Sequence, residues 1–176
     1  VDRLVHQMRY LAGNVSSSGD SFPLSPLIEE AYQEARKYQP GKAAKLNNES
    51  SGKPVVVAGD RTALKHAFSE IILNALQSNP ASPSVAVRYR DDAIGAGMHE
   101  VKIEVEDNGP GFTAESQREA TTPFFTTRIP GVGLGLAVTR KIIETHHGKL
   151  EIPPPQPGQP GVVRVSLPVG TTETKH

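Results

Sequence analysis

A glycine-rich turn, Thr126-Thr-Arg-Ile-Pro-Gly-Val-Gly-Leu-Gly-Leu-Ala137, leads directly into a predicted helix. Gly131, Gly133 and Gly135 let the backbone approach a ligand closely, because glycine carries no Cβ. The start of the following helix offers unpaired N–H groups and the positive end of a dipole, which suit phosphate. The same glycines suit close packing at a corner before a helix, so both interpretations stay open on this stretch alone.

An acidic residue ends a regular predicted strand. Val101-Lys-Ile-Glu-Val-Glu106 alternates as a strand does and runs into Asp107-Asn-Gly-Pro-Gly-Phe112, where turn residues gather. Gly109 and Gly111 leave little side-chain bulk beside the Asp107 carboxylate. Such a carboxylate can accept a hydrogen bond from an exocyclic amino group, as adenine has. A plain Asp-Asn-Gly turn is the alternative.

A helix is predicted over residues 60–77, with Asp60 as its N-cap. Its apolar face comprises Leu64, Phe68, Ile71, Ile72 and Ala75. Glu70 and Asn74 stand four residues apart and project from one side of the helix. Carboxylate and amide oxygens at this spacing can hold Mg²⁺ against a polyphosphate. A solvated polar pair on a surface helix is the alternative.

The order of these motifs resembles the ATP-binding domain of sensor histidine kinases. Residues 70–75 resemble the N box of that family, 107–111 the G1 box, Phe124 and Phe125 the F box, and 131–135 the G2 box. The resemblance extends from about Ser21 to Pro168. Residues 122–128 and 146–150 resemble most the kinases of the nitrogen-regulation type, which have short lids.

The resemblance implies an enzyme, a protein-histidine kinase, that transfers the γ-phosphate of ATP with the help of Mg²⁺. Asp107 would bind the adenine amino group, and Asn74 and Glu70 would act as the catalytic and metal-binding pair. The implied nucleotide-binding residues are Asn74, Asp107, Gly109, Gly111, Phe124, Thr126, Thr127, Gly131, Gly133, Leu134 and Gly135. Residues 113–130 would form a mobile lid that closes on the nucleotide.

The resemblance also implies partners: the dimerisation and histidine-phosphotransfer domain of the same protein, and a response regulator downstream. Residues 1–19 are expected to be the end of the second dimerisation helix plus a linker, 20–170 the ATP-binding domain, and 171–176 a disordered tail. His6 is not expected to be the phosphate acceptor, because Gln7 follows it where the family carries an acid. This chain alone is therefore not expected to phosphorylate itself.

Composition agrees with a single core-bearing domain. The 176 residues carry a formal net charge of zero, which gives no reason to expect binding to nucleic acid or to an acidic membrane. The chain has no cysteine, which excludes disulfides and cysteine-ligated metal and fits a cytoplasmic protein. The parent protein could still be anchored in a membrane through other segments.

The remaining pattern predicts an α+β fold, a two-layer α/β sandwich of the Bergerat type with a mixed, mostly antiparallel sheet packed against three helices. Helices are expected over 26–38, 60–77 and 133–147. Strands are expected over 22–24, 43–47, 55–58, 85–90, 101–106, 149–152 and 162–167. A proline-rich hairpin loop fills 153–161, and a polyproline ligand is its alternative. His146 and His147 end the third helix, where its dipole favours positive charge.

Three residues depart from the family's pattern. Glu70 stands where histidine kinases usually carry asparagine, and Gln77 replaces a lysine found in many members. No hydroxyl residue follows Gly161. Two other functions therefore stay open: an ATPase of the gyrase, mismatch-repair or heat-shock chaperone kind with Glu70 as its general base, and a nucleotide-sensing docking module.

Overall fold

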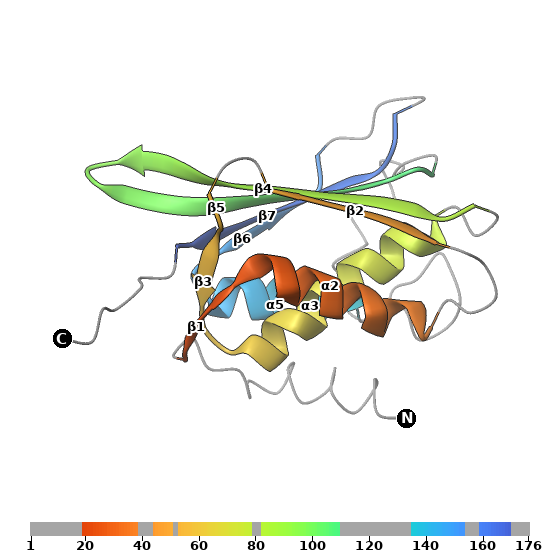
Figure 1. Ribbon diagram of the computed structural model, residues 1–176, viewed down its shortest axis with the longest axis horizontal. Helices are drawn as coiled ribbons and strands as arrows, with labels where there is room; N and C mark the ends of the chain where they lie inside the picture. The colour runs from red at the N-terminus through yellow and green to blue at the C-terminus, as the bar shows by residue number, and fades with distance from the viewer. Residues whose placement is uncertain are drawn as a thin grey trace.

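Two layers make up the part of the domain that the structure describes, with the sheet on one side and its three helices on the other (Figure 1). The computed structural model describes residues 19–38, 44–50, 53–78, 82–109, 135–153 and 159–169. Its helices are α2 (Leu24–Arg36), α3 (Arg61–Gln77) and α5 (Gly135–Thr145). Its strands are β1 (Ser21–Pro23), β2 (Lys45–Ser50), β3 (Val56–Ala58), β4 (Ser84–Gly95), β5 (Met98–Asp107), β6 (Lys149–Glu151) and β7 (Val162–Pro168).

The main sheet has the strand order β2-β4-β5-β7-β6. Only β2 and β4 run parallel within it, and the other three neighbouring pairs are antiparallel. β1 and β3 form a separate two-stranded antiparallel ribbon, which an isolated bridge from Val57 to Val169 ties to the end of β7. The predicted fold class, a mixed and mostly antiparallel sheet on three helices, is confirmed.

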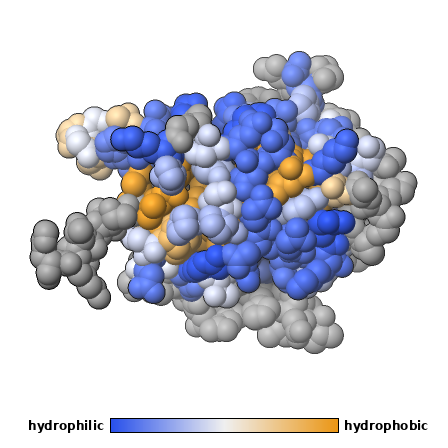
Figure 2. All heavy atoms as spheres, in the orientation of Figure 1, coloured by the Kyte–Doolittle hydropathy of each residue, from blue (hydrophilic) through white to orange (hydrophobic). Residues whose placement is uncertain are grey.

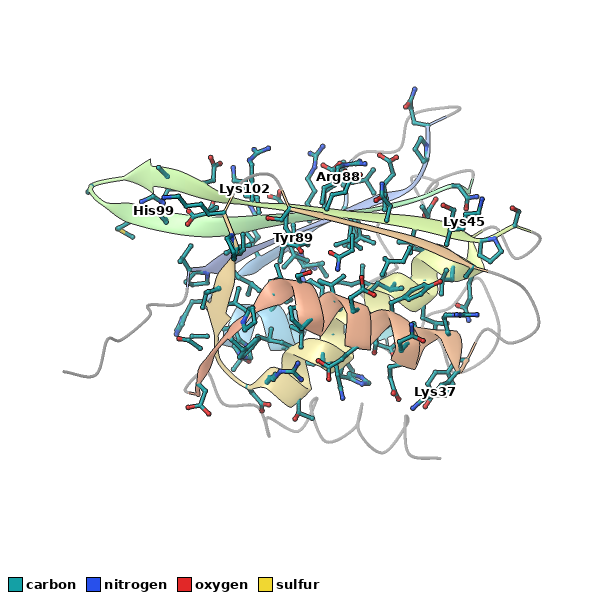
Figure 3. All side chains as sticks on the ribbon, viewed as in Figure 1. Lys37, Lys45, Arg88, Tyr89, His99 and Lys102 are labelled. Atoms are coloured by element: carbon teal, nitrogen blue, oxygen red, sulfur yellow. The ribbon has the colours of Figure 1, made fainter. Side chains whose placement is uncertain are left out.

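The core lies between the sheet and the helices, because alternate residues of each strand face the helical layer. Val87, Ile103 and Val165 are buried on the inner face, while Arg88, Glu104 and Arg164 lie on the outer face. Figure 3 shows this alternation at Arg88 and Tyr89, which point to opposite sides of β4. Burying one such large side chain contributes about 1.5–3 kcal/mol.

α3 is the central helix and packs against α2, α5 and the inner face of β4 and β5. Its expected apolar face is buried, but Leu73, Leu76, Ser69 and Glu70 are buried as well. Asp60 caps it as predicted, since its Oδ1 accepts a hydrogen bond from the backbone N–H of Ala63 at 3.0 Å. A helix enclosed on most sides offers few positions from which a polar side chain reaches solvent.

The outer face of the sheet is covered by charged side chains. The strand register lines up Glu49, Arg88, Glu104, Arg164 and Glu151 in one row of alternating charge across all five strands. Arg88 lies 3.2 Å from Glu104 and 3.0 Å from Glu106. A hollow of about 1110 Å³ lies over this face, on the opposite side of the sheet from the helices. Figure 2 shows the mostly hydrophilic surface along this side of the molecule.

The expected lengths of two strands were wrong. β4 and β5 continue past the predicted ends and form a long hairpin that closes tightly at residues 95–97. Gly95, Ala96 and Gly97 all have positive φ there, which makes the turn compact. Beyond Arg90 the hairpin extends past the hydrophobic core, so most of its side chains are exposed. They lack the alternation of apolar and polar residues by which a strand is predicted from sequence.

Other predictions were accurate to within a few residues. α2 begins two residues before the predicted start, at Leu24, and β2 ends three residues beyond its predicted end, at Ser50. Of the expected end of the dimerisation helix with its linker, residues 1–19, all but Gly19 lie outside the described residues, as do the lid and the C-terminal tail. Within the described part of the chain, no helix is long and apolar enough to cross a membrane.

Candidate nucleotide-binding site

Asp107 is the last residue of β5, and two backbone N–H groups hold its side chain. Oδ1 accepts hydrogen bonds from the N–H of Gly109 at 2.8 Å and from that of Gly161 at 3.1 Å. The N–H of Asp107 in turn donates to the carbonyl of Gly161 at 2.9 Å. Asp107 is therefore fixed both to its own turn and to the strand beside it.

Gly109 brings this turn against the end of α3. A Cβ built on Gly109 would lie 2.6–2.7 Å from Oγ, Cβ and the carbonyl oxygen of Ser78, the residue that caps α3 at its C-terminus. A backbone carbonyl cannot give way cheaply, so only glycine fits there. Asn74 lies one turn before Ser78 on the same side of the helix. The close contact thus places the Asp107 turn next to the helix end that carries Asn74.

Asn108 secures the turn from its other side. Its Oδ1 accepts from the N–H of Ser84 at 3.1 Å, and its Nδ2 donates to the carbonyl of Ser82 at 2.7 Å. The residue between the acid and the glycine therefore ties the turn to the start of β4. Asp107 is thus held from the side of β4 as well as from the side of β7.

Glu70 and Asn74 differ in exposure although they share one side of α3. Glu70 is only 4% exposed, whereas Asn74 is partly exposed. The Glu70 carboxylate lies 3.9 Å from Nε2 of His66, one turn earlier in the helix. The alternative of a solvated surface pair is wrong, because a surface pair would leave Glu70 in water.

α5 runs antiparallel to α3 and starts beside the same region. Near its middle, the hydroxyl of Thr139 donates to the carbonyl of Ala67 at 3.4 Å. Near its end, Nε2 of His146 accepts from the backbone N–H of Asp60 at 3.0 Å. Because the two helices are antiparallel, the N-terminal end of α5 at Gly135 lies toward the half of α3 that carries Glu70 and Asn74. The positive N-terminal end of α5 lies on the side of these two residues.

The oxygen ligands that α3 offers fit a complex of Mg²⁺ with a nucleotide. Glu70 and Asn74 supply hard oxygen atoms, which Mg²⁺ prefers, and Mg²⁺ usually takes its remaining ligands from phosphates and water. The described residues contain no group of three or more His, Cys, Asp or Glu that could hold a metal by themselves. Such a site suits a cation that arrives with a polyphosphate.

The structure brings together some of the predicted nucleotide-binding residues and does not describe others. Asp107 and Gly109 share the turn that packs against Ser78, one helical turn beyond Asn74 at the end of α3, and Gly135 is the first residue of α5. Gly111, Phe124, Thr126, Thr127, Gly131, Gly133 and Leu134 lie outside the described residues.

Two features of this region were missed or misjudged from the sequence. Gly161 contacts Asp107 from a position 54 residues away, and no local pattern signals such a contact. The expected positive charge on His146 is wrong. Its ring is buried, its Nδ1 donates to the carbonyl of Ile142 at 2.8 Å and its Nε2 accepts from Asp60, so the ring is neutral.

Comparison with known proteins places these motifs in a family. A family model described as histidine kinase-, DNA gyrase B-, and HSP90-like ATPase matches residues 59–171. The chain belongs to this ATPase family. The match covers α3, β4, β5, α5, β6 and β7, the elements that carry the site.

The individual relatives include sensor histidine kinases. The sensor histidine kinase ZraS of Klebsiella oxytoca is 28% identical over 169 residues, which cover 96% of this chain and 36% of ZraS. The signal transduction histidine-protein kinase AtoS of Escherichia coli is 32% identical over 129 residues, 72% of this chain and 19% of AtoS. The chain thus spans about a third or less of these proteins.

Solved structures give the same result. The nucleotide-free catalytic domain of histidine kinase ThkA is 26% identical with a TM-score of 0.69, over 86% of this chain and 95% of that domain. Full-length ShkA in complex with AMPPNP shares the fold at a TM-score of 0.73, over 97% of this chain and 35% of ShkA, with 20% identity. The chain therefore has the fold and the family motifs of the ATP-binding catalytic domains found in histidine kinases.

Proposed function

We propose that this domain binds Mg-ATP and transfers its γ-phosphate to a histidine on the dimerisation domain of the same protein. The observation that carries the proposal is the position of Asp107, held by two N–H groups next to the helix end that bears Asn74. A response regulator would then receive the phosphate. ATP is available in the cytoplasm, where we place the domain.

Each part of the site has a distinct task. Asp107 accepts a hydrogen bond from the adenine amino group, while Asn74 and Glu70 hold the cation. The N-terminal end of α5 at Gly135 and the preceding glycines Gly131 and Gly133 donate N–H groups to the phosphates. Bound Mg²⁺ supplies neutralisation of the phosphate charge. Phosphoryl transfer needs this positioning more than it needs covalent chemistry from the protein.

The phosphate acceptor comes from another domain in this proposal. Relatives such as ZraS are roughly three times as long as this chain, which leaves room for that domain and for a sensor. We also assign the chain to the nitrogen-regulation type of kinase. The support for that subtype is the sequence of residues 122–128 and 146–150.

Nucleotide titration of the 176-residue chain by calorimetry tests the proposal. We expect a micromolar Kd for Mg-ATP and ADP, about −6 to −8 kcal/mol, and weaker binding of GTP. Asp107→Asn should weaken ATP binding by about 1–3 kcal/mol, because it removes the charged acceptor. Equal affinity for ATP and GTP, or an unchanged affinity in Asp107→Asn, would contradict the adenine assignment.

A second assay tests transfer itself. The chain with labelled ATP should stay unlabelled until the dimerisation domain of its parent protein is added, and the acid-labile label should then appear on that domain. Label on His6 of this chain would contradict the proposed division of tasks.

A further inference from the structure

We propose that Gly161 is a positioning residue for base recognition, because its backbone sets the direction of the Asp107 carboxylate. The inference rests on the proposed role of Asp107 in binding adenine. It adds that recognition of the base is divided between two neighbouring strands: β5 supplies the carboxylate, and the residue before β7 orients it.

The first observation is the distribution of hydrogen bonds on the carboxylate. Both N–H donors, from Gly109 and Gly161, meet the same oxygen, Oδ1. A carboxylate oxygen that accepts two N–H bonds is held in place, and the other oxygen is then also fixed. Oδ2 receives no hydrogen bond from the described residues and is the oxygen left to accept from a ligand.

The second observation is the space at Gly161. A Cβ built there would overlap Oδ2 of Asp107 and would lie 3.1 Å from its Cγ. The carboxylate thus occupies the space that a side chain at position 161 would need. A side chain at position 161 would rotate the Asp107 carboxylate, and Oδ2 would then no longer point in its present direction.

The backbone of Gly161 makes the substitution informative. Its φ lies outside the positive range that side chains avoid, so an alanine meets no intrinsic backbone strain. Gly161 also pairs its carbonyl with the N–H of Asp107 at 2.9 Å, a bond that alanine can keep. The main clash in Gly161→Ala is therefore with the Asp107 side chain itself.

The test compares Gly161→Ala, Asp107→Asn and the double variant of the 176-residue chain by calorimetry with Mg-ATP and Mg-GTP. We expect Gly161→Ala to weaken ATP binding at least tenfold and to reduce the preference for ATP over GTP. In the Asp107→Asn background the same change should weaken ATP binding less than threefold, because residues that act through one another are not additive.

Gly97→Ala serves as the matched control. It is also a glycine-to-alanine change, it lies at the tip of the β4–β5 hairpin, and nothing lies within 4 Å of the added Cβ. It is strained by its φ of +75° and should lower stability without changing nucleotide preference. A Gly161→Ala variant that loses only thermal stability and keeps the wild-type ATP/GTP ratio would overturn the positioning role.

The outcomes separate the two proposals. If Asp107→Asn has no effect, the adenine assignment of the proposed function fails. If Asp107→Asn weakens binding but Gly161→Ala does not, only the positioning role fails. Should Gly161→Ala not fold, NMR of the unmodified chain and of Asp107→Asn decides: the amide proton signals of both Gly109 and Gly161 should shift when the charged acceptor is removed, and a Gly161 amide that does not respond overturns the inference.

Discussion

Nε2 of His146, near the end of α5, accepts a hydrogen bond from the backbone N–H of Asp60, the N-cap of α3, at 3.0 Å. The N–H groups at the start of a helix have no partner within the helix. Here the side chain of His146, 86 residues away, accepts from the N–H of Asp60. Gly59 makes room for the ring, because a Cβ on it would overlap the imidazole carbon and nitrogen. This contact fixes the antiparallel alignment of α5 and α3, on which the position of the N-terminal end of α5, the proposed phosphate-binding end, depends.

Replacement of His146 should therefore lower the free energy of unfolding of the domain. His146→Ala removes a buried ring and leaves the Asp60 N–H without an acceptor, and we expect a loss of about 2–4 kcal/mol in the free energy of unfolding. Urea denaturation followed by circular dichroism measures it. A loss below 0.5 kcal/mol, roughly the effect of an ordinary surface substitution, would show that the contact does not hold the helices together.

Replacement of the neighbouring His147 by glycine should instead raise the stability of the domain. His147 lies two residues beyond the end of α5 and has a φ of 60°, a left-handed conformation that most side chains avoid. His147→Gly should raise the free energy of unfolding by about 0.5–1 kcal/mol, while His147→Val should lower it, because a branched side chain fits this conformation poorly. Equal denaturation midpoints for the two variants would contradict this account.

The elements with strong local signals were predictable. Asp60 precedes an apolar helical repeat and caps α3 as expected, because a cap acts within four residues. The ends of β4 and β5 were not predictable, since the polar residues of the projecting hairpin show no apolar alternation. The sequence pattern therefore located the core and missed the hairpin that extends beyond it.

The candidate site shows the same limit. Asp107, Asn74 and Glu70 were identified because each belongs to a recognisable motif. The contacts that hold the Asp107 turn, from Gly161 to Asp107 and from Ser78 to Gly109, join distant segments, and no local sequence pattern predicts which residues meet. The neutral state of His146 was also missed, because a histidine at a helix end is normally judged by the dipole of its own helix.

The outer sheet face gives a prediction on pH. Burial opposes ionisation of Glu104, but hydrogen bonds from Arg88 and Arg164 outweigh it and lower the pKa of Glu104 below the usual 4.5. Because the folded pKa is depressed, the ionised carboxylate contributes stability above the unfolded pKa, and the contribution is lost as the pH falls through the folded value. Partial exposure to water limits its size.

Glu104→Gln should therefore lower the free energy of unfolding by about 0.5–1 kcal/mol at pH 7 and by much less near pH 3. Glu49→Gln is the control, because Glu49 lies in the same charged row but forms no ion pair within the described residues, and its variant should stay within about 0.5 kcal/mol at both values. A Glu104→Gln difference that is the same at pH 7 and pH 3 would contradict the ionic explanation.

Asn74 should affect binding of nucleotide mainly in the presence of magnesium. Asn74→Ala removes an oxygen ligand from the partly exposed side of α3. We expect Mg-ATP affinity to fall about tenfold or more, whereas affinity for ADP in EDTA changes by less than threefold, a difference of about 1 kcal/mol between the two conditions. Calorimetry with and without magnesium measures both, and equal losses in the two conditions would remove Asn74 from the metal site.

Glu70 decides between the two enzyme classes that this family contains. It is buried one turn before Asn74, so it can orient the metal or act as a base that activates water. A base must reach a water in line with the γ-phosphate, whereas in a histidine kinase the attacking group is an imidazole that another domain supplies. We therefore expect Glu70→Gln to lower Mg-ATP affinity modestly, about two- to tenfold or 0.4–1.4 kcal/mol. Hydrolysis of ATP by the 176-residue chain should be negligible before and after the change, with Glu104→Gln as a control away from the site. A steady ATPase rate in the unmodified chain that disappears in Glu70→Gln would show that Glu70 is the general base, and the chain would then act as a hydrolase of the same family.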